Sequence, residues 1–399
     1  MSSEPRKKRL TRRTFLIGAG AVAGASLLPV AWSAWQARPL ALKAGLLLPN
    51  AASYPGLADQ VRAGLEATRH PALASLELIA APIDAGVGLA TAQAQALLQE
   101  ARVDLVIAYL NSRVATRLRP IFEAAQRPLI VLDTGANIVR ATERSPFVFY
   151  NSLGHWQAAY MAGRRLVEQH GPRVFIAAAL FDSGYDTLNA VQQGVRDAGG
   201  EIIQTYVTHI NPRETGIAEA LAAIRSTHPH SVFALYAGAA AADFVGAYLD
   251  AGLSGKLPLT GSGFLTEGLA AQKLGGRAAG VASLLGWAAD PSHPSAVARA
   301  DAFAALGDDT AGLIGAAVEA AGEPARWGES SLTLAFDGAR GALRLDPTTR
   351  VLAGPLHWRT GRLAREGLLN VSVEAVPFPE RPPEIPEMQA AWLNPYLCS

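Results

Sequence analysis

Residues 173–208 run RVFIAAALFDSGYDTLNAVQQGVRDAGGEIIQTYVT, two short apolar stretches that flank a helical one. The first apolar stretch is Arg173–Phe181, and helical spacing then covers Tyr185–Ala198. Two glycines end this helix before the second apolar stretch, Glu201–Thr208. A short apolar strand, a helix of about 10–15 residues and another strand are typical of a parallel sheet covered by helices on both faces.

The same unit recurs along most of the chain. Four apolar stretches begin near residues 42, 76, 104 and 128, and four more begin near residues 173, 201, 231 and 257. The similar intervals, without sequence identity, indicate a duplicated fold. We therefore expect an α/β protein with two Rossmann-like, doubly wound lobes. One long sheet of eight strands is the alternative.

The last third of the chain departs from this rhythm. Helical spacing returns over residues 296–305 and again over residues 310–320, and a polar β segment follows at residues 334–346. Five prolines lie between residues 377 and 386, so residues 377–399 are predicted to form an extended strap or a loose arm.

Composition excludes several classes of protein. Half of the residues are hydrophobic, 17% are charged and the net charge is +1, which excludes intrinsic disorder. Cys398 has no second cysteine to pair with, so no disulfide framework is possible. The body contains no block of basic residues for a nucleic-acid surface. Only one long apolar stretch is present, which excludes a membrane protein with several spans.

The positive charge is concentrated at the N-terminus. Residues 1–15 carry a net charge of +5 within the total of +1, so the rest of the chain carries −4. Arg12 and Arg13 precede Phe15-Leu16 and an apolar stretch that ends near Trp35. This pattern resembles a twin-arginine export signal over residues 1–37 and predicts a periplasmic protein. An uncleaved inner-membrane anchor is the alternative.

One motif in this leader resembles a dinucleotide-binding fingerprint. Gly18-Ala19-Gly20-Ala21-Val22-Ala23 has the form G-x-G-x-x-A. That fold requires an acidic residue about 20 positions later to bind the ribose, and residues 36–46 contain none. We therefore assign the motif to the signal peptide.

The chain shows no sequence signature of catalysis or metal binding. Neither a G-x-S-x-G elbow, a P-loop nor an H-E-x-x-H helix occurs. His228-Pro229-His230 has no adjacent third ligand, and Cys398 has no evident base beside it. We expect a protein that is not an enzyme and that holds no cofactor and no metal. A catalytic pair assembled from distant loops is left open.

Polar and aromatic residues instead follow the predicted strands at their carboxyl ends. Ligands of doubly wound sheets bind at this edge. Each such residue alone is also suited to cap a helix or to form a turn. The predicted ligand contacts are Ser53, Tyr54, Asn111, Ser112, Asp133, Thr134, Tyr185, Tyr236, Ser262 and Phe264.

Three segments together resemble one protein family. Val148-Phe149-Tyr150-Asn151 leads into a helix, and Phe181-Asp182-Ser183-Gly184-Tyr185-Asp186 precedes another that ends at Ala198-Gly199-Gly200. Phe336-Asp337-Gly338 is followed by Gly341 and Leu345-Asp346. This ordered set is similar to the type I periplasmic solute-binding proteins of ABC importers, in the branch that binds leucine, isoleucine, valine and amides. The resemblance covers about residues 41–370.

The resemblance implies two lobes joined by a hinge with three crossings. Lobe one would comprise residues 41–150 and 286–345, and lobe two residues 151–285 and 346–376. The cleft would capture a solute (an amide, an aromatic or an amino-acid-like molecule) and deliver it to an ABC permease in the inner membrane. A ligand-sensing or accessory periplasmic subunit without a transport role is the alternative.

Two positions depart from the family pattern. Amino-acid binders carry a carboxylate where this chain has Ser262-Gly263-Phe264, and Glu267 comes later. Asp133 stands where those binders carry a small residue, so it would meet a cation, amide or hydroxyl, or cap the following helix. With Tyr185, Tyr236 and Phe264 at strand ends, these departures favour a less polar or aromatic cargo.

Overall fold

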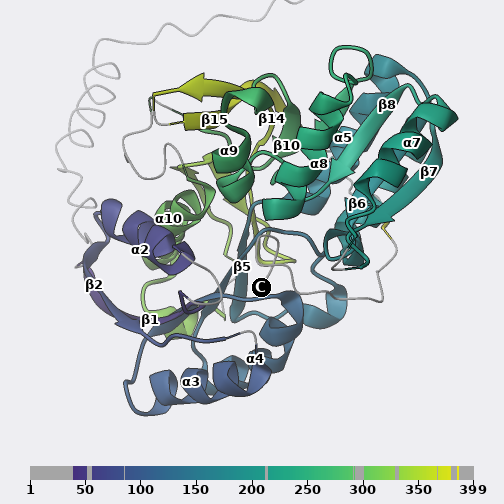
Figure 1. Cartoon of the computed structure of the whole chain (residues 1–399). Helices are drawn as coiled ribbons and strands as arrows, with labels where there is room; N and C mark the ends of the chain where they lie inside the picture. Colours follow the sequence, from purple (N-terminus) through teal and green to yellow (C-terminus); the bar gives the residue numbers. More distant parts are fainter. Residues whose placement is uncertain are drawn as a thin grey trace, which may run out of the picture. The chain divides into compact units, whose positions relative to one another are not determined.

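A computed structural model of the chain describes residues 39–51, 56–84, 86–211, 214–290, 292, 301–328, 332–365, 367–378 and 384–385 (Figure 1). The predicted export signal, with Arg12 and Arg13, lies outside the described residues, as do Ser53 and Tyr54. None of the helices in these ranges has the length and apolar character that a membrane span requires.

The first sheet has eight strands. Strands β1 to β5 pair in parallel, β13 adds to β5 in parallel, and the polar segment forms an antiparallel hairpin of β11 and β12 beyond it. In spatial order the strands are β11 (Ala335–Gly338), β12 (Gly341–Leu345), β13 (Val351–Ala353), β5 (Val148–Ser152), β4 (Leu129–Asp133), β3 (Leu105–Tyr109), β1 (Leu40–Leu47) and β2 (Leu73–Ala80).

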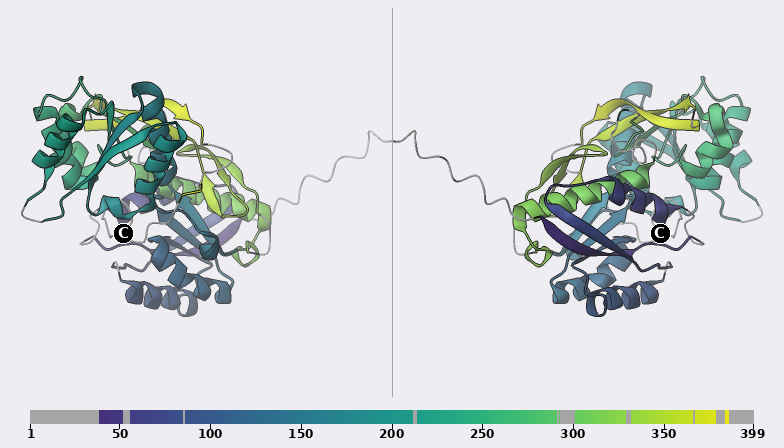
Figure 2. Two further views of the ribbon diagram at one scale, coloured as in Figure 1. Left: turned by 90° about the vertical axis from the view of Figure 1, so that its right-hand side faces the viewer. Right: turned by 90° about the vertical axis from the view of Figure 1, so that its left-hand side faces the viewer.

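The second sheet has seven strands. Its parallel part follows the same doubly wound pattern, and the C-terminal hairpin of β14 and β15 pairs antiparallel with β10 (yellow strands in Figure 2). In spatial order the strands are β15 (Gly367–Val376), β14 (Leu356–Ala364), β10 (Ala282–Leu285), β9 (Leu259–Gly261), β8 (Ser231–Leu235), β6 (Arg173–Ala179) and β7 (Glu201–Thr208). The prediction of two doubly wound lobes is confirmed, and the alternative of one sheet is wrong.

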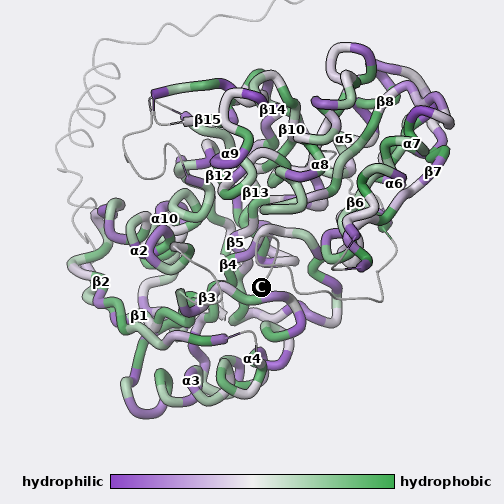
Figure 3. Tube along the Cα trace, viewed as in Figure 1, coloured by the Kyte–Doolittle hydropathy of each residue, from purple (hydrophilic) through white to green (hydrophobic). Residues whose placement is uncertain are grey.

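Helices cover both faces of each sheet. In the first lobe α3 (Val87–Gln99) and α4 (Ser112–Ala125) pack on one face, and α2 (Leu57–Ala67) and α10 (Ala302–Ala321) on the other (Figure 1). In the second lobe the two faces are covered by α5 (His155–His170) with α6 (Asp186–Asp197), and by α7 (Ile217–Thr227), α8 (Gly238–Asp250) and α9 (Gly268–Leu274). Strands enclosed in this way are apolar along their length, as the green tube at β3 shows (Figure 3).

Helix α10 differs from the sequence-based expectation of two separate helical segments. The described parts of the two predicted helical segments belong to one continuous helix over Ala302–Ala321, and residues 296–300 of the first segment lie outside the described residues. The polar run Asp308-Asp309-Thr310 interrupts the apolar spacing and suggested a break. In the structure all three side chains are buried and bonded: Asp309 pairs with Arg340, and Thr310 accepts a hydrogen bond from Asn151. These polar residues can therefore stand within a buried helix because residues distant in sequence bond to them.

The chain passes between the two sheets at three places that lie close together. Leu153 and Gly154 join β5 to α5, residues from Gly286 onward lead from β10 toward α10, and Gly354-Pro355 joins β13 to β14. The backbone N–H of Gly286 donates to the Leu153 carbonyl at 2.9 Å. A Cβ on Gly286 would lie 2.5 Å from that carbonyl oxygen, so the close approach of these two crossings requires glycine.

A buried carboxyl connects the end of β6 with the start of α8. Asp182 is 1% exposed, and its Oδ2 accepts a hydrogen bond from the Ala237 backbone N–H at 3.2 Å. Burial raises the pKa of Asp182 to about 8. The carboxyl is therefore largely protonated at neutral pH in the folded protein.

Substitution of Gly64 in α2 is predicted to destabilise the first lobe. A Cβ at this position would lie 2.0 Å from the Ala304 carbonyl oxygen of α10, so the two helices must separate. We expect Gly64→Ala to lower the free energy of unfolding by about 1–3 kcal/mol in denaturant titrations. Gly88→Ala in α3, where no atom lies within 4 Å, is the matched control and should raise it by about 0.5–1 kcal/mol. Equal effects of the two changes would contradict the close helix contact.

The protonated Asp182 makes stability fall as pH rises. Its folded pKa lies above the value near 4 of an unfolded aspartate, so between these values folding takes up a proton. Relative to Asp182→Asn, the wild-type protein should lose up to about 1.4 kcal/mol of unfolding free energy per pH unit across this window. Chemical denaturation from pH 5 to pH 8 measures this difference. Asp59→Asn on the exposed face of α2 is the control. A difference independent of pH would show that Asp182 is ionised.

Candidate functional site

The loop after β4 contacts the start of α6, the helix that follows β6. The backbone N–H and the Oγ1 of Thr187 both donate to the Ala136 carbonyl, at 3.1 and 3.0 Å. Asp186 Oδ2 accepts from the Ile138 backbone N–H and from Arg140 Nη2, each at 2.9 Å. The strand ends of the two lobes therefore meet at one seam, where doubly wound sheets bind ligands.

Aromatic side chains from both lobes fill the seam. The ring of Phe303, at the start of α10, lies edge-on to Tyr109 at 5.8 Å and stacks on Phe264 at 6.4 Å. Phe264 in turn meets the His155 ring edge-on at 5.4 Å. Tyr185 and Trp287 belong to the same buried core. We call this set the interlobe aromatic cluster: Tyr109, His155, Tyr185, Phe264, Trp287 and Phe303.

Three residues at the cluster have buried polar atoms that find no hydrogen-bond partner within the described part of the chain. They are Thr134 Oγ1, His155 Nδ1 and Nε2, and Trp287 Nε1. The His155 backbone N–H donates to the Thr134 carbonyl at 3.0 Å. Trp287 follows Gly286, which is bonded to Leu153 two residues before His155. The unsatisfied atoms thus lie on three segments that are bonded to one another.

His155 is a neutral imidazole in this site. Burial, and secondarily the charge of Arg359, lower the pKa of His155 to about 3. A neutral imidazole offers one donor and one acceptor, Thr134 offers both, and the indole N–H of Trp287 only donates. Within the described ranges no three His, Cys, Asp or Glu side chains are grouped as a metal site. The cluster can therefore form neutral hydrogen bonds and aromatic contacts.

Glu267 has a structural role. Its Oε1 accepts from Arg359 Nη1 and from Asn370 Nδ2, both at 2.8 Å. Arg359, which is fully buried, also donates to the carbonyls of Gly263 and Trp287. This buried network holds the loop that carries Phe264 and the segment that carries Trp287.

Asp133 ends β4 on the face of the strand that carries Val131, whereas Leu132 on the other face packs in the core that contains Tyr109, Phe264 and Trp287. Asp133 Oδ1 accepts from the Gly135 backbone N–H at 3.0 Å, and burial raises the pKa of Asp133 to about 7. Asp133 lines a cavity of about 540 Å³ beside the three crossings, which we call the hinge cavity. Its lining also includes Ile138, Arg140, Arg144, Tyr150, Trp156, Gln157, Asp346, Phe378, Glu384 and Ile385.

Three of the remaining predicted ligand residues, Asn111, Tyr236 and Ser262, have local partners. Asn111 caps α4 by accepting from the Val114 backbone N–H at 2.9 Å, and Ser112 is the first residue of that helix. Tyr236 is fully buried, its hydroxyl lies 3.0 Å from Thr208 Oγ1, and its ring stacks on Phe244. Ser262 Oγ donates to the Tyr236 carbonyl at 3.2 Å. Of the ten predicted contacts, Thr134, Tyr185 and Phe264 lie at the cluster.

Sequence analysis missed four members of the site, which are Tyr109, His155, Trp287 and Phe303. Phe303 lies in the first turn of α10, in a stretch that the sequence assigned only to a helix. Trp287 follows the end of β10, so the same strand-end rule would have identified it. Tyr109 is the last residue of β3 and was assigned to the strand. His155 is the first residue of α5, and no signal in the sequence distinguishes it from an ordinary residue of a helix start.

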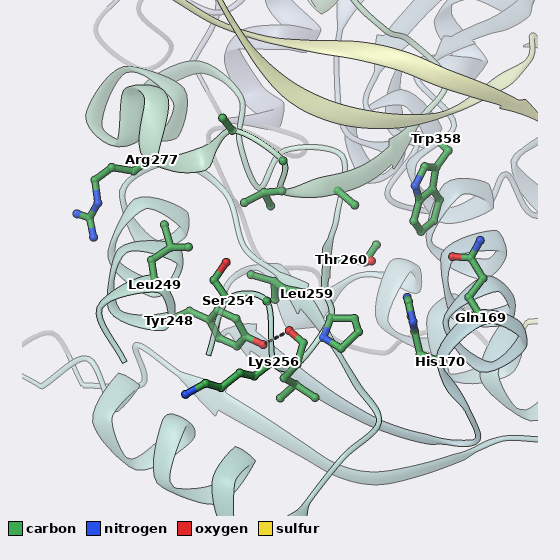
Figure 4. Close-up of a pocket in the computed structure, with 17 residues that line it drawn as sticks. Gln169, His170, Tyr248, Leu249, Ser254, Lys256, Leu259, Thr260, Arg277 and Trp358 are labelled. Carbon is green, nitrogen blue, oxygen red and sulfur yellow. Dashed lines mark hydrogen bonds between the residues drawn. The ribbon is translucent and has the colours of Figure 1, made fainter. Parts of the chain in front are cut away.

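A second cavity, of about 550 Å³, lies in the second lobe at the opposite edge of the sheet (Figure 4). Its lining includes Tyr248, Lys256, Thr260 and Trp358, and residues that precede β9 and β10. The Tyr248 hydroxyl donates to the Leu257 carbonyl at 2.8 Å. Since this cavity is at the amino ends of the strands, it is not where a doubly wound sheet binds its ligand.

Curated proteins of similar sequence are named as homologs of a Leu/Ile/Val-binding protein. "Leu/Ile/Val-binding protein homolog 6" of Brucella melitensis and its namesake in Brucella abortus are each 26% identical to this chain over 209 residues, which is 51% of this chain and 53% of the relative. The chain thus spans about half the length of the curated relatives it matches.

Solved structures share the fold. A substrate-binding protein of an ABC transporter from Sphaerobacter thermophilus has a TM-score of 0.73 at 22% identity and covers 85% of this chain and 98% of its own. An ABC-transporter solute-binding protein of Rhodopseudomonas palustris bound to benzoate has a TM-score of 0.67 at 24% identity, with coverage of 84% and 98%. Another from the same species, bound to 3,4-dihydroxybenzoic acid, has a TM-score of 0.69 at 18% identity, with coverage of 85% and 98%.

A protein-family model described as "Periplasmic binding protein" matches residues 75–339. This segment is more than half of the chain and extends from β2 through α10 to the hairpin of β11 and β12. It therefore contains strands from both sheets and the segments that carry the interlobe aromatic cluster. The chain belongs to the periplasmic binding protein family.

Proposed function

We propose that this chain is an exported solute-binding protein that captures a small molecule at the interlobe aromatic cluster and delivers it to an ABC importer. The observation that carries the proposal is the set of unsatisfied atoms of Thr134, His155 and Trp287. A buried polar group without a partner costs about 1–3 kcal/mol. A solute that bonds to these atoms removes that cost, so it stabilises the arrangement in which the lobes meet.

The cargo is a small, largely apolar or aromatic molecule with hydrogen-bonding groups. The six members of the cluster provide flat walls, and the unsatisfied atoms are all on neutral groups. Glu267 is bonded to Arg359 and Asn370, so it is not placed to receive the ammonium group of an amino acid. The benzoates bound to two neighbours of this fold agree in kind with such a cargo.

Three of the predicted contacts form the proposed primary site. Thr134, Tyr185 and Phe264 would touch the solute together with His155 and Trp287. Asn111, Ser112, Tyr236 and Ser262 would hold the surrounding loops, and Ser53 and Tyr54 remain predicted contacts from the loop after β1. We propose that the two sheets with their helices move as the two lobes about the three crossings.

In this proposal the N-terminal leader determines the compartment in which the protein acts. Arg12 and Arg13 would direct the folded chain through the twin-arginine route to the periplasm, and an inner-membrane permease would receive the solute. The family match is consistent with this location, since the family is that of periplasmic binding proteins.

Trp287→Phe is predicted to weaken solute binding while the fold is retained. The change removes the indole Nε1–H and keeps an aromatic wall, so the affinity should fall by about tenfold, the usual effect of one lost hydrogen bond to a buried group. Native mass spectrometry of the exported protein identifies the bound solute, and isothermal titration gives the dissociation constants.

Trp358→Phe is the matched control for this experiment. Trp358 lines the cavity of the second lobe and packs against Arg165, away from the cluster. Its substitution should leave solute affinity unchanged. Weakening by Trp358→Phe and not by Trp287→Phe would contradict the proposed site.

A further inference from the structure

The hinge cavity has the character of a second binding site. Its volume of about 540 Å³ lies within the range of pockets that hold small molecules. Both lobes line it: Asp133 and Tyr150 come from the first sheet, whereas Trp156 and Gln157 come from the first turn of α5. Phe378 closes one side, after β15.

Aromatic and apolar side chains form its walls. The rings of Trp156 and Phe378 meet edge-on at 5.3 Å, and Tyr150 is 2% exposed. Ile138 and Ile385 complete this apolar surface. Such walls fit a flat ring, and their faces also attract a cation.

Two polar atoms of the cavity lining are buried without a partner among the described residues: the acceptor Gln157 Oε1 and the donor Arg140 Nε, whose guanidinium is already engaged through its other two nitrogens. The Asp133 carboxyl accepts hydrogen bonds from the backbone N–H of Gly135, two residues later in its own loop, and from the side chain of Ser152. A ligand that donates hydrogen bonds would satisfy both Gln157 Oε1 and the Asp133 carboxyl.

The charges of the lining favour a cation. Three carboxyl groups, those of Asp133, Asp346 and Glu384, stand against two guanidinium groups. Arg140 is already paired with Asp186 of α6 at 2.9 Å, and it donates to the Ile385 carbonyl. Against the opposing effect of burial, hydrogen bonds from Thr349 and Thr348, and after them the charge of Arg144, lower the pKa of Asp346. Asp133 is thus left without a cationic partner at hydrogen-bond distance among the described residues.

We propose that the hinge cavity binds a small aromatic amine, with its ring against Trp156 and Phe378 and its ammonium group on Asp133 and Gln157 Oε1. The site is distinct from the interlobe aromatic cluster, because neither Thr134 nor any member of the cluster lines the hinge cavity. Since both lobes line the cavity, an amine bound there favours the arrangement in which the lobes are together.

Three probes of nearly the same shape test the charge that the cavity selects. Tryptamine carries an ammonium group, tryptophol a hydroxyl and indole-3-propionate a carboxylate on the same ring system. Isothermal titration of the full chain at pH 7.5 should show binding of tryptamine, with an affinity at least about tenfold above that of the other two probes. Equal binding of the three, stronger binding of the carboxylate, or no binding of any probe would overturn the proposal.

Two substitutions locate the bound amine. Asp133→Asn keeps the shape and removes the charge, and Gln157→Leu removes the unsatisfied acceptor, so each should lower tryptamine affinity by about tenfold. Asp59→Asn, on the exposed face of α2, should have no effect. Thermal unfolding of each variant verifies that it is folded.

Trp287→Phe separates this site from the proposed cargo site. It should leave tryptamine affinity unchanged even where it weakens binding of the co-purified solute. Loss of tryptamine binding in Trp287→Phe, with no loss in Asp133→Asn and Gln157→Leu, would place the amine at the interlobe aromatic cluster and overturn the proposal.

Discussion

The buried guanidinium of Arg340 joins the elements on which the hinge depends. It pairs with Asp309 of α10 and donates to the Asn151 side chain and the Ser152 carbonyl of β5. Asn151 in turn donates to the Leu306 carbonyl and to Thr310 Oγ1, both at 2.9 Å. One cation thus fixes α10, the last strand before the first crossing, and the hairpin of β11 and β12. Removal of either partner of such a buried pair costs about 3–5 kcal/mol.

A second buried cation has the same role in the other lobe. Arg359 on β14 bonds to Glu267 and to the carbonyls of Gly263 and Trp287, and so it orients two segments of the interlobe aromatic cluster. In both lobes the buried charged groups are therefore paired within the protein, and only Asp309 Oδ1 and Arg359 Nε of these two pairs find no hydrogen-bond partner among the described residues. The unsatisfied atoms of Thr134, His155 and Trp287 at the seam belong to neutral groups. This division explains how a rigid hinge can coexist with a site that releases its solute.

The fold could be predicted from the sequence further than the site could. Each of the eight apolar stretches is a strand, and the central ones, such as β3, are apolar along their length because burial on both faces leaves a signal that is local in sequence. The continuity of α10 could not be predicted, since Asp309 is explained only by Arg340, a residue 31 positions away. The same limit applies to the site: nothing near His155 or Trp287 in the sequence shows that their nitrogen atoms lack partners. That Asp133 lines the hinge cavity and Thr134 does not depends on where β4 ends, at Asp133, which the sequence does not show.

A crystal structure of the exported protein with its co-purified solute tests the account most directly. We predict that the solute lies within about 2.7–3.2 Å of Thr134 Oγ1, a nitrogen of His155 and Trp287 Nε1, against the rings of Tyr185 and Phe264. A solute bound elsewhere, with these atoms bonded to ordered water or to the protein, would contradict the claim that the interlobe aromatic cluster is the cargo site.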